Sequence, residues 1–303
     1  MFLFCVFKKL WDRLFLIESN NKELFGFGAE NILQKFLIEK NYKVFFNRIL
    51  KSPYNKNHFL EIDAICYHNN TIFCIEMKNY KGTVYYAANF KNDTFDSYKE
   101  NKIIQLKTDK HLNQTYKELP NPLYKTILFT KQLKKYLLHL DNRFSTIKFI
   151  SVVVFLNLST NIDNIRSFDG GVIYLSELDK FLDQKSGNEK NNSWAVQILE
   201  QLPSFDKIIT INNQPIQGII KNNIIACHRP NIELQLKNIK TININHTLTS
   251  CKSKLKIEYV DFTTREFECQ KLFISLDKFG TIQTHRLSNI KKIIVGTHTL
   301  RPF

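Results

Sequence analysis

Residues 59–80, FLEIDAICYHNNTIFCIEMKNY, consist of two apolar runs on either side of a polar centre. The runs are rich in β-branched and aromatic side chains, and such runs around an Asn-Asn pair are typical of a β-hairpin. With Asn69 and Asn70 as a two-residue turn, the strands are expected at about 58–67 and 72–79. The stretch therefore predicts a hairpin whose register is fixed by its turn.

This register brings charged side chains together. It sets Asp63 opposite Glu76, and it sets Glu61 opposite Lys78 by the same count. Because side chains two residues apart on a strand share a face, all four groups are expected on one face of the hairpin. Two facing carboxylates repel each other unless a cation lies between them or one of them keeps its proton. A divalent metal ion at Asp63 and Glu76 is therefore expected.

Segments on both sides of the hairpin extend the pattern into an α/β unit. Helices are expected over 28–40 and over 122–140, the second with a Pro in its first turn. Ser176 is expected to cap a third helix. Residues 97–120 are polar and rich in lysine, and they are expected to be partly helical or loop. Further strands are expected at 43–50, 83–86, 90–95, 148–156 and 171–175.

The order of these elements resembles a known fold. A helix, a strand, an acidic strand, a Glu-x-Lys strand, a helix and a strand resemble the restriction-endonuclease-like core, whose motif is written PD-(D/E)xK. Residues 25–140 resemble more closely the nuclease-related domain, NERD. The matching pieces are Gly28-Ala29-Glu30, Glu61-Ile62-Asp63, Ile75-Glu76-Met77-Lys78-Asn79, Lys81-Gly82 and Asn121-Pro122-Leu123. The resemblance implies a mixed central sheet flanked by helices.

The resemblance also implies metal-dependent hydrolysis of phosphodiester bonds and a role for each motif residue. Asp63 and Glu76 would hold Mg²⁺ or Mn²⁺, with the backbone carbonyl of Met77 as a further ligand. Lys78 would orient or activate the attacking water and stabilise charge in the transition state. Glu30 would bind a second metal or the attacking water, unless it is only a first-turn acid favoured by the helix dipole.

One position departs from the family pattern. NERD sequences usually have a Gln shortly after the Asn-Pro pair, where this chain has Lys125. Glu61 has two open interpretations, holding the Lys78 ammonium or forming a surface ion pair. Candidates for contacts with nucleic-acid phosphates are Lys81, Lys125, Lys131 and Lys135. A solvated helix face is the alternative for the last two.

Composition limits the class of protein. The chain has 303 residues, of which 43% are apolar, so it is globular and long enough for two domains. A net charge of +15 favours a polyanionic partner, which is either a nucleic acid or an acidic membrane surface. DNA is the expected nucleic acid, and RNA is not excluded. The six cysteines form no Cys-x-x-Cys pair, which argues against a structural zinc site and suits a reducing cytoplasm.

Four regions are expected along the chain. Residues 1–20 have helical spacing and predict an amphipathic helix, which either packs on the protein or lies on a membrane surface through residues 1–17; it is too short and too charged to span a bilayer. A NERD-like domain is expected over 21–183, and a linker with a short helix over 184–206. An all-β domain is expected over 207–303.

The C-terminal region has an almost wholly β pattern. Strands are expected near 207–212, 217–227, 232–244, 254–262, 265–276, 280–285 and 290–295, which favours a small barrel or sandwich. Tyr259 and the segment from Arg286 to Ile290 weakly resemble a WYL-type, Sm-like barrel, but the aromatic tripeptide of that family is absent. No internal repeat stands out.

Three functional hypotheses follow. The first is a cytoplasmic, Mg²⁺- or Mn²⁺-dependent nuclease that acts on DNA in defence or DNA processing. In this hypothesis the β domain binds substrate or a protein partner, and the nuclease could be a homodimer. The second is a non-catalytic nucleic-acid-binding protein on the same fold. The third is a membrane-surface protein that uses residues 1–17.

Overall fold

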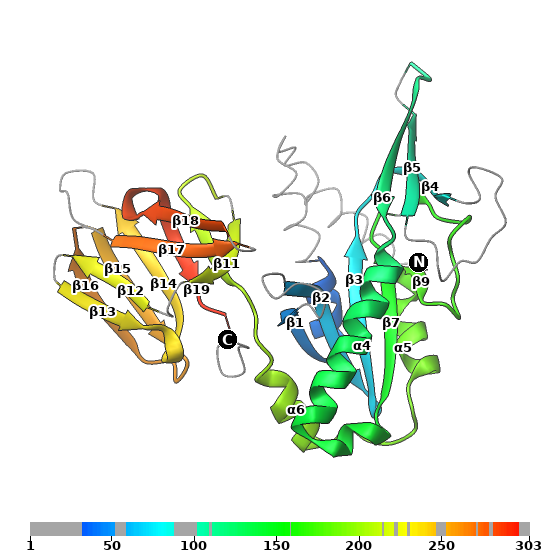
Figure 1. Cartoon of the computed structure of the whole chain (residues 1–303), viewed down its shortest axis with the longest axis horizontal. Coiled ribbons are helices and arrows are strands. Elements are labelled where there is room, and N and C mark those ends of the chain that lie inside the picture. Colours follow the sequence, from blue (N-terminus) through cyan, green and yellow to red (C-terminus); the bar gives the residue numbers. More distant parts are fainter. Residues whose placement is uncertain are drawn as a thin grey trace.

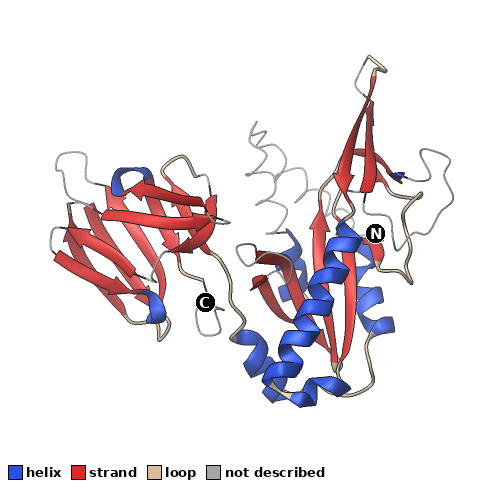
Figure 2. Ribbon diagram, viewed as in Figure 1, coloured by secondary structure: helices blue, strands red, loops and turns tan. Residues whose placement is uncertain are grey.

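The structure is a computed structural model, and it describes residues 32–51, 59–87, 102–108, 111–157, 159–213, 215–220, 224–228, 231–246, 253–270, 272–278 and 281–296. These residues form a mixed α/β part followed by an antiparallel β part (Figure 1, Figure 2). The predicted fold class is therefore confirmed. The expected N-terminal helix, Glu30 and the strand expected at 90–95 lie outside the described residues.

A five-stranded mixed sheet forms the centre of the α/β part. The first three strands across the sheet are antiparallel, and the last two join in parallel. In order across the sheet the strands are β1 (Lys43–Lys51), β2 (Phe59–His68), β3 (Thr71–Lys78), β7 (Lys148–Phe155) and β9 (Val172–Tyr174). β3 is the middle strand, and all but its last residue are buried, as expected for a strand covered on both faces.

Helices cover both faces of this sheet. Alternate side chains of β3 point to opposite faces of the sheet. On one face, Phe73 and Ile75 pack with Leu33 of the helix at 32–39 and with side chains of α5 (Leu178–Lys185). Ile72 and Cys74 pack on the other face against α4 (Pro122–Leu140) and α6 (Ser193–Glu200). Side chains at even positions of β3 therefore point toward α4.

The hairpin turn has the predicted form. Asn69 and Asn70 have φ values of 44° and 55°, so both lie in the left-handed region that a two-residue type I′ turn requires. The ladder pairs His68 with Thr71 and continues to Ala64 and Ile75. Asparagine tolerates this backbone conformation better than most residues, which explains the Asn-Asn pair.

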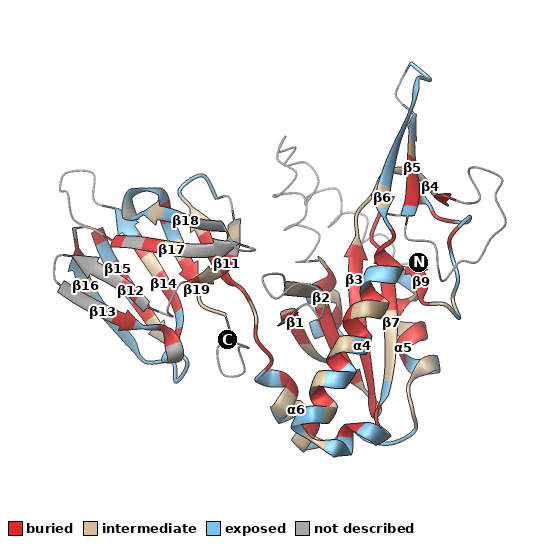
Figure 3. Cartoon of the chain, in the orientation of Figure 1, coloured by how far each residue is buried: buried red, intermediate tan, exposed pale blue. Residues whose placement is uncertain are grey.

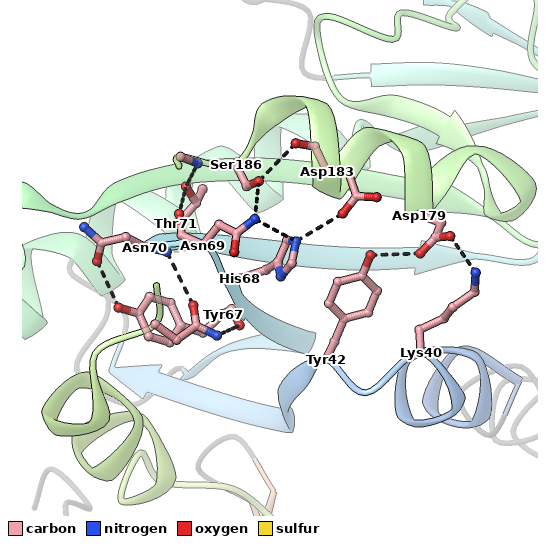
Figure 4. Close-up of polar contacts among 12 residues, drawn as sticks. Lys40, Tyr42, Tyr67, His68, Asn69, Asn70, Thr71, Asp179, Asp183 and Ser186 are labelled. Carbon is pink, nitrogen blue, oxygen red and sulfur yellow. Dashed lines mark hydrogen bonds and ion pairs between the residues drawn. The ribbon is translucent and has the colours of Figure 1, made fainter. Parts of the chain in front are cut away.

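A polar network joins the turn to the segment after α5 (Figure 4). The backbone N–H of Gly187 donates to the Asn69 carbonyl at 3.0 Å, and Asn70 Nδ2 donates to Glu189 Oε2 at 2.7 Å. Asn192 Nδ2 donates to Asn70 Oδ1 at 3.0 Å. The segment at 184–206, expected as a linker with a short helix, contains that helix as α6, which packs on the central sheet. Much of the remaining segment is hydrogen-bonded to the hairpin turn. The boundaries of the four expected regions stay a prediction.

A β arm is inserted between β3 and α4. Its strands are β4 (Gly82–Tyr86), β5 (Lys102–Thr108) and β6 (Gln114–Pro120), and β8 (Thr160–Asn161) completes a four-stranded sheet of order β6-β5-β4-β8. The expectation of helix or loop over 97–120 is wrong for β5 and β6, whereas the strand expected at 83–86 is present as β4. Figure 3 shows β6 largely exposed, and the strand therefore lacks the apolar alternation by which strands are recognised.

The start of α4 agrees with its sequence signals, whereas the start of α5 does not. Asn121 caps α4 by accepting the N–H of Leu123 at 3.0 Å, and Pro122 follows at the first helical position. The expectation that Ser176 caps the next helix is wrong. Ser176 lies inside the 3-10 turn Leu175–Glu177, and α5 begins directly after it.

The C-terminal part is one ten-stranded antiparallel sheet around a single apolar core. Each of the strands expected at 217–227, 232–244 and 265–276 is in fact two strands. The strands are β10 (Asp206–Thr210), β11 (Pro215–Ile220), β12 (Ile224–His228), β13 (Asn231–Gln235), β14 (Ile239–His246), β15 (Ser253–Tyr259), β16 (Thr264–Cys269), β17 (Leu272–Lys278), β18 (Thr281–Arg286) and β19 (Ile290–Ile294).

The strands of this part repeat one pattern twice, so the expectation of no internal repeat is wrong. β10 to β13, a 3-10 turn and β14 are followed by β15 to β18, a 3-10 turn and β19. The turns lie in similar segments, LKNIKTI at 236–242 and LSNIKKI at 287–293. Each half pairs its last strand with the first strand of the other half, β14 with β15 and β19 with β10. The two halves therefore exchange strands.

Among the described helices, none combines the length and the apolar character that a bilayer-spanning segment needs.

Candidate active site

The candidate site lies where β2 and β3 part at the carboxyl end of β3. The ladder between these strands ends at Ala64 and Ile75. Beyond the ladder, the Asp63 side chain replaces a backbone partner: its Oδ2 accepts a hydrogen bond from the backbone N–H of Met77 at 2.6 Å. The predicted cross-strand pairs of Asp63 with Glu76 and of Glu61 with Lys78 are therefore not part of the ladder. Glu61 lies opposite Ile49 of β1.

Three of the four groups predicted to meet are nevertheless close together, and Glu61 is not among them. Glu76 and Lys78 follow Ile72 and Cys74 on the α4 side of β3, because positions two apart share a face. Lys78 Nζ donates to Glu76 Oε1 at 2.5 Å. Asp63 is close enough to both groups for their charges to alter its protonation. The structure thus brings Asp63, Glu76 and Lys78 together.

Glu76 also has a partner that the hairpin alone did not predict. Lys125 Nζ, from the first turn of α4, donates to both carboxylate oxygens of Glu76 at 3.1 Å each. The Glu76 side chain is only 2% exposed, so this buried carboxylate lies between two ammonium groups. The signal in the sequence was the position of Lys125 after Asn-Pro, where the family has a Gln. From the sequence alone, Lys125 is predicted only as a candidate phosphate contact.

Electrostatics assign different protonation to the two acids. Burial, and then the charge of Glu76, raise the pKa of Asp63 from its ordinary 3.8 to about 7, against the opposing effects of Lys78 and the Met77 N–H. Burial also raises the pKa of Glu76, but Lys78 and Lys125 outweigh it, and the net shift is downward. Burial lowers the pKa of Lys78, but Glu76 and Asp63 reverse this. Near neutral pH Glu76 and Lys78 are charged, whereas Asp63 exchanges its proton.

The remaining predicted residues are less closely tied to this cluster. Lys81 is exposed, three residues beyond Lys78, and its backbone carbonyl accepts a 2.7 Å bond from Gln105 Nε2 of the arm. Lys131 and Lys135 are exposed farther along α4. Asn79, part of the sequence motif, has both polar side-chain atoms buried without a hydrogen-bond partner among the described residues. Such an amide is expected to bond a ligand or ordered water.

The donor set fits a hard divalent cation. Within the described ranges no cluster of three or more His, Cys, Asp or Glu side chains is present, so the two carboxylates are the side-chain donors. Mg²⁺ commonly binds through one or two carboxylates and keeps several waters. The Met77 N–H faces Asp63, whereas the Lys78 carbonyl accepts Leu156 N on the β7 side at 3.0 Å. Since N–H and C=O of one strand residue point to the same edge, the Met77 carbonyl faces the opening beside Asp63.

Comparisons with known proteins give a match to one family model. Residues 25–156 match the family model described as NERD, nuclease-related domain. A search of curated proteins and a search of solved structures found no match. The matched segment includes β1, β2, β3, α4 and β7 and every residue of the cluster. The resemblance of this segment to the nuclease-related domain is therefore confirmed, the PD-(D/E)xK assignment is consistent with it, and the function it indicates is nuclease-related.

Proposed function

We propose that this protein is a nuclease that hydrolyses phosphodiester bonds of DNA with the help of Mg²⁺ or Mn²⁺. One observation carries the proposal. Asp63 and the buried Glu76 lie close together at the end of the β2–β3 ladder, and Lys78 contacts Glu76 at 2.5 Å. This is the arrangement that an acid and a Glu-x-Lys strand need for phosphodiester hydrolysis.

Each residue of the cluster has a chemical task in this proposal. Asp63, Glu76 and the Met77 carbonyl would hold the metal, which when bound supplies an acidified water and charge neutralisation at the phosphate. Lys78 remains protonated beside Glu76, so its ammonium can position a water or stabilise charge that develops on the phosphate. Glu30 stays a candidate for the attacking water or a second metal.

The charge distribution supports nucleic acid as the substrate. Net charge is +15, and α4 contains no Asp or Glu while it carries Lys125, Lys131, Lys134 and Lys135. Lys81, Lys125, Lys131 and Lys135 are proposed to contact phosphates, which hold the polymer without reading its sequence. We propose DNA as the substrate, and the cleavage test below can show RNA instead. The proposal includes a cytoplasmic role in defence or DNA processing. The C-terminal β part would bind substrate or a protein partner, and a homodimer fits the proposal.

Cleavage assays on single-stranded, double-stranded and nicked DNA and on RNA test the activity. We expect wild type to cut in Mg²⁺ or Mn²⁺ but not in EDTA. Asp63→Asn and Lys78→Ala should reduce the rate at least about a hundredfold while nucleic-acid binding persists. Cleavage that survives in both variants would refute the assigned roles.

A second function has one observation in its favour. Lys78 and Lys125 both contact Glu76 and balance its charge, as in a site kept for structure. A nucleic-acid-binding protein without catalysis would show this arrangement too. If purified wild type binds DNA or RNA but cuts neither with any divalent metal, this second function is the correct one. The membrane-surface alternative concerns residues 1–17, which lie outside the described residues.

A further inference from the structure

We propose that Lys125 competes with the metal for Glu76: it occupies this carboxylate in the metal-free protein and is displaced toward the substrate when the metal binds. The inference rests on the proposed function, because it concerns loading of the same site. It assigns to Lys125 a role that a Gln at this position cannot have.

The contacts of Lys125 identify it as an occupant of the ligand atoms. Its Nζ is 3.1 Å from both Glu76 Oε1 and Glu76 Oε2, so it takes one acceptor position on each oxygen. Lys78 bonds Oε1 in addition. A metal that binds Glu76 would lie beside two ammonium groups, and the repulsion between the metal and these groups favours displacement of one of them.

Counting charges points in the same direction. A metal binds both acids in their ionised form, and in that form Asp63 and Glu76 balance Lys78 and Lys125, so the set of groups that the metal joins has no net charge. A Gln in place of Lys125 would leave one net negative charge, which attracts a divalent cation. Because the site is buried, where charges interact more strongly than in water, this difference is large enough to alter metal affinity.

Exposure shows which lysine can move. The side chain of Lys125 is 45% exposed, whereas that of Lys78 is 22% exposed. Lys125 reaches Glu76 from α4 through a flexible four-carbon stem, so rotation of the stem carries the ammonium into solvent without moving the helix. A displaced Lys125 remains beside the site, where a phosphate of bound nucleic acid is the anion it would meet.

Mn²⁺ binding without nucleic acid tests the competition, measured by calorimetry or electron paramagnetic resonance. Lys125→Gln should bind Mn²⁺ about tenfold more tightly than wild type, and Lys125→Arg, which keeps the charge, should not. Lys134→Gln is the matched control, since it removes the same charge from the same helix but its ammonium lies over the Phe149 ring. It should change affinity less than about twofold. Equal affinities in Lys125→Gln and Lys134→Gln would overturn the proposal.

A second readout needs no substitution. Acylation of lysine amines, followed by mass spectrometry, should modify Lys125 faster in Mn²⁺ than in EDTA, while Lys134 reacts equally in both. An unchanged or slower reaction of Lys125 in Mn²⁺ would also overturn the proposal.

Asp63→Asn separates this inference from the proposed function. Added to Lys125→Gln, it should abolish the tight Mn²⁺ binding. If the binding persists, the metal lies elsewhere, and the proposed function fails together with this inference. If wild type binds Mn²⁺ through Asp63 but Lys125→Gln binds no more tightly, only the role of Lys125 is refuted.

Discussion

Asp63 takes the place of a backbone group where two strands separate. Its Oδ2 bonds the Met77 N–H, which has no partner in the ladder beyond Ile75. The side chain thus satisfies a backbone donor and also presents a carboxylate at the site. Burial in this position raises the pKa of Asp63, and the raised pKa can be measured.

The raised pKa of Asp63 predicts how stability depends on pH. In unfolded protein this acid ionises near 3.8, whereas in folded, metal-free protein it keeps its proton up to about 7. An acid whose pKa rises on folding loses stabilisation as pH increases from the unfolded to the folded value. The unfolding free energy of Asp63→Asn minus that of wild type should therefore increase between about pH 4 and pH 7 and then level off. Urea denaturation in EDTA measures it, and a constant or falling difference would contradict the assignment.

Asn70 allows a test of the turn. Its side chain bonds Glu189 and Asn192, and its backbone has a φ of 55°. Asn70→Gly keeps this conformation but loses the hydrogen bonds, which should cost about 2 kcal/mol of unfolding free energy. Asn70→Ala should cost about 1 kcal/mol more, because it also strains the backbone. Urea denaturation compares them, with Asn69→Gly as the control.

Asn69 is a suitable control because its side-chain contacts are longer. Its Nδ2 lies 3.3 Å from Ser186 Oγ and 3.2 Å from His68 Nε2. Asn69→Gly should therefore cost less than about 1 kcal/mol. If both Asn70 variants unfold like wild type, the network shown in Figure 4 does not stabilise the fold.

At the scale of elements, local signals decided which parts could be predicted. The Asn-Asn pair defined the β2–β3 hairpin, and Asn121-Pro122 defined the start of α4. β6 gave no such signal, because it has polar side chains on both faces and is a strand through its backbone pairing with β5. The strand conformation of β6 is therefore set by its pairing with β5 and not by a pattern in its own residues.

The arm is expected to take part in nucleic-acid binding. Lys107 and Lys117 share a face with Gln105, since Gln105 pairs with Lys117 across the ladder and Lys107 lies two residues farther along β5. Gln105 bonds the Lys81 carbonyl beside the site, so this face continues from the site along the arm. The double variant Lys107→Gln/Lys117→Gln should weaken DNA binding about tenfold and reduce its salt dependence. Fluorescence anisotropy at several salt concentrations measures both.

A matched control for the arm removes two lysines at the opposite end of the central sheet. Lys43 and Lys148 are exposed at the hairpin-turn end, opposite Tyr67 and Thr71. Lys43→Gln/Lys148→Gln should change affinity by less than about threefold. If the two double variants weaken binding equally, the arm has no special part and only net charge matters.

At the scale of the whole molecule, tertiary packing decided what remained hidden. Asp63, Glu76 and Lys78 could be grouped from the sequence because a hairpin register relates them. The contact of Lys125 with Glu76 depends on how α4 packs against β3, which no local pattern specifies. The repeat was hidden because only the segments at 236–242 and 287–293 remain clearly similar, while the rest of each half differs.

The exchanged strands of the C-terminal part also have a consequence for assembly. Each half completes its sheet with a strand of the other half, β14 with β15 and β19 with β10. Two separate chains joined in this manner would be a domain-swapped dimer, whose formation depends on concentration. Here the covalent connection between β14 and β15 makes the association intramolecular, at a millimolar effective concentration in the usual range for short linkers. The β part is thus built like a dimer of two tethered halves with the same strand order, and cutting that connection would restore the dependence on concentration.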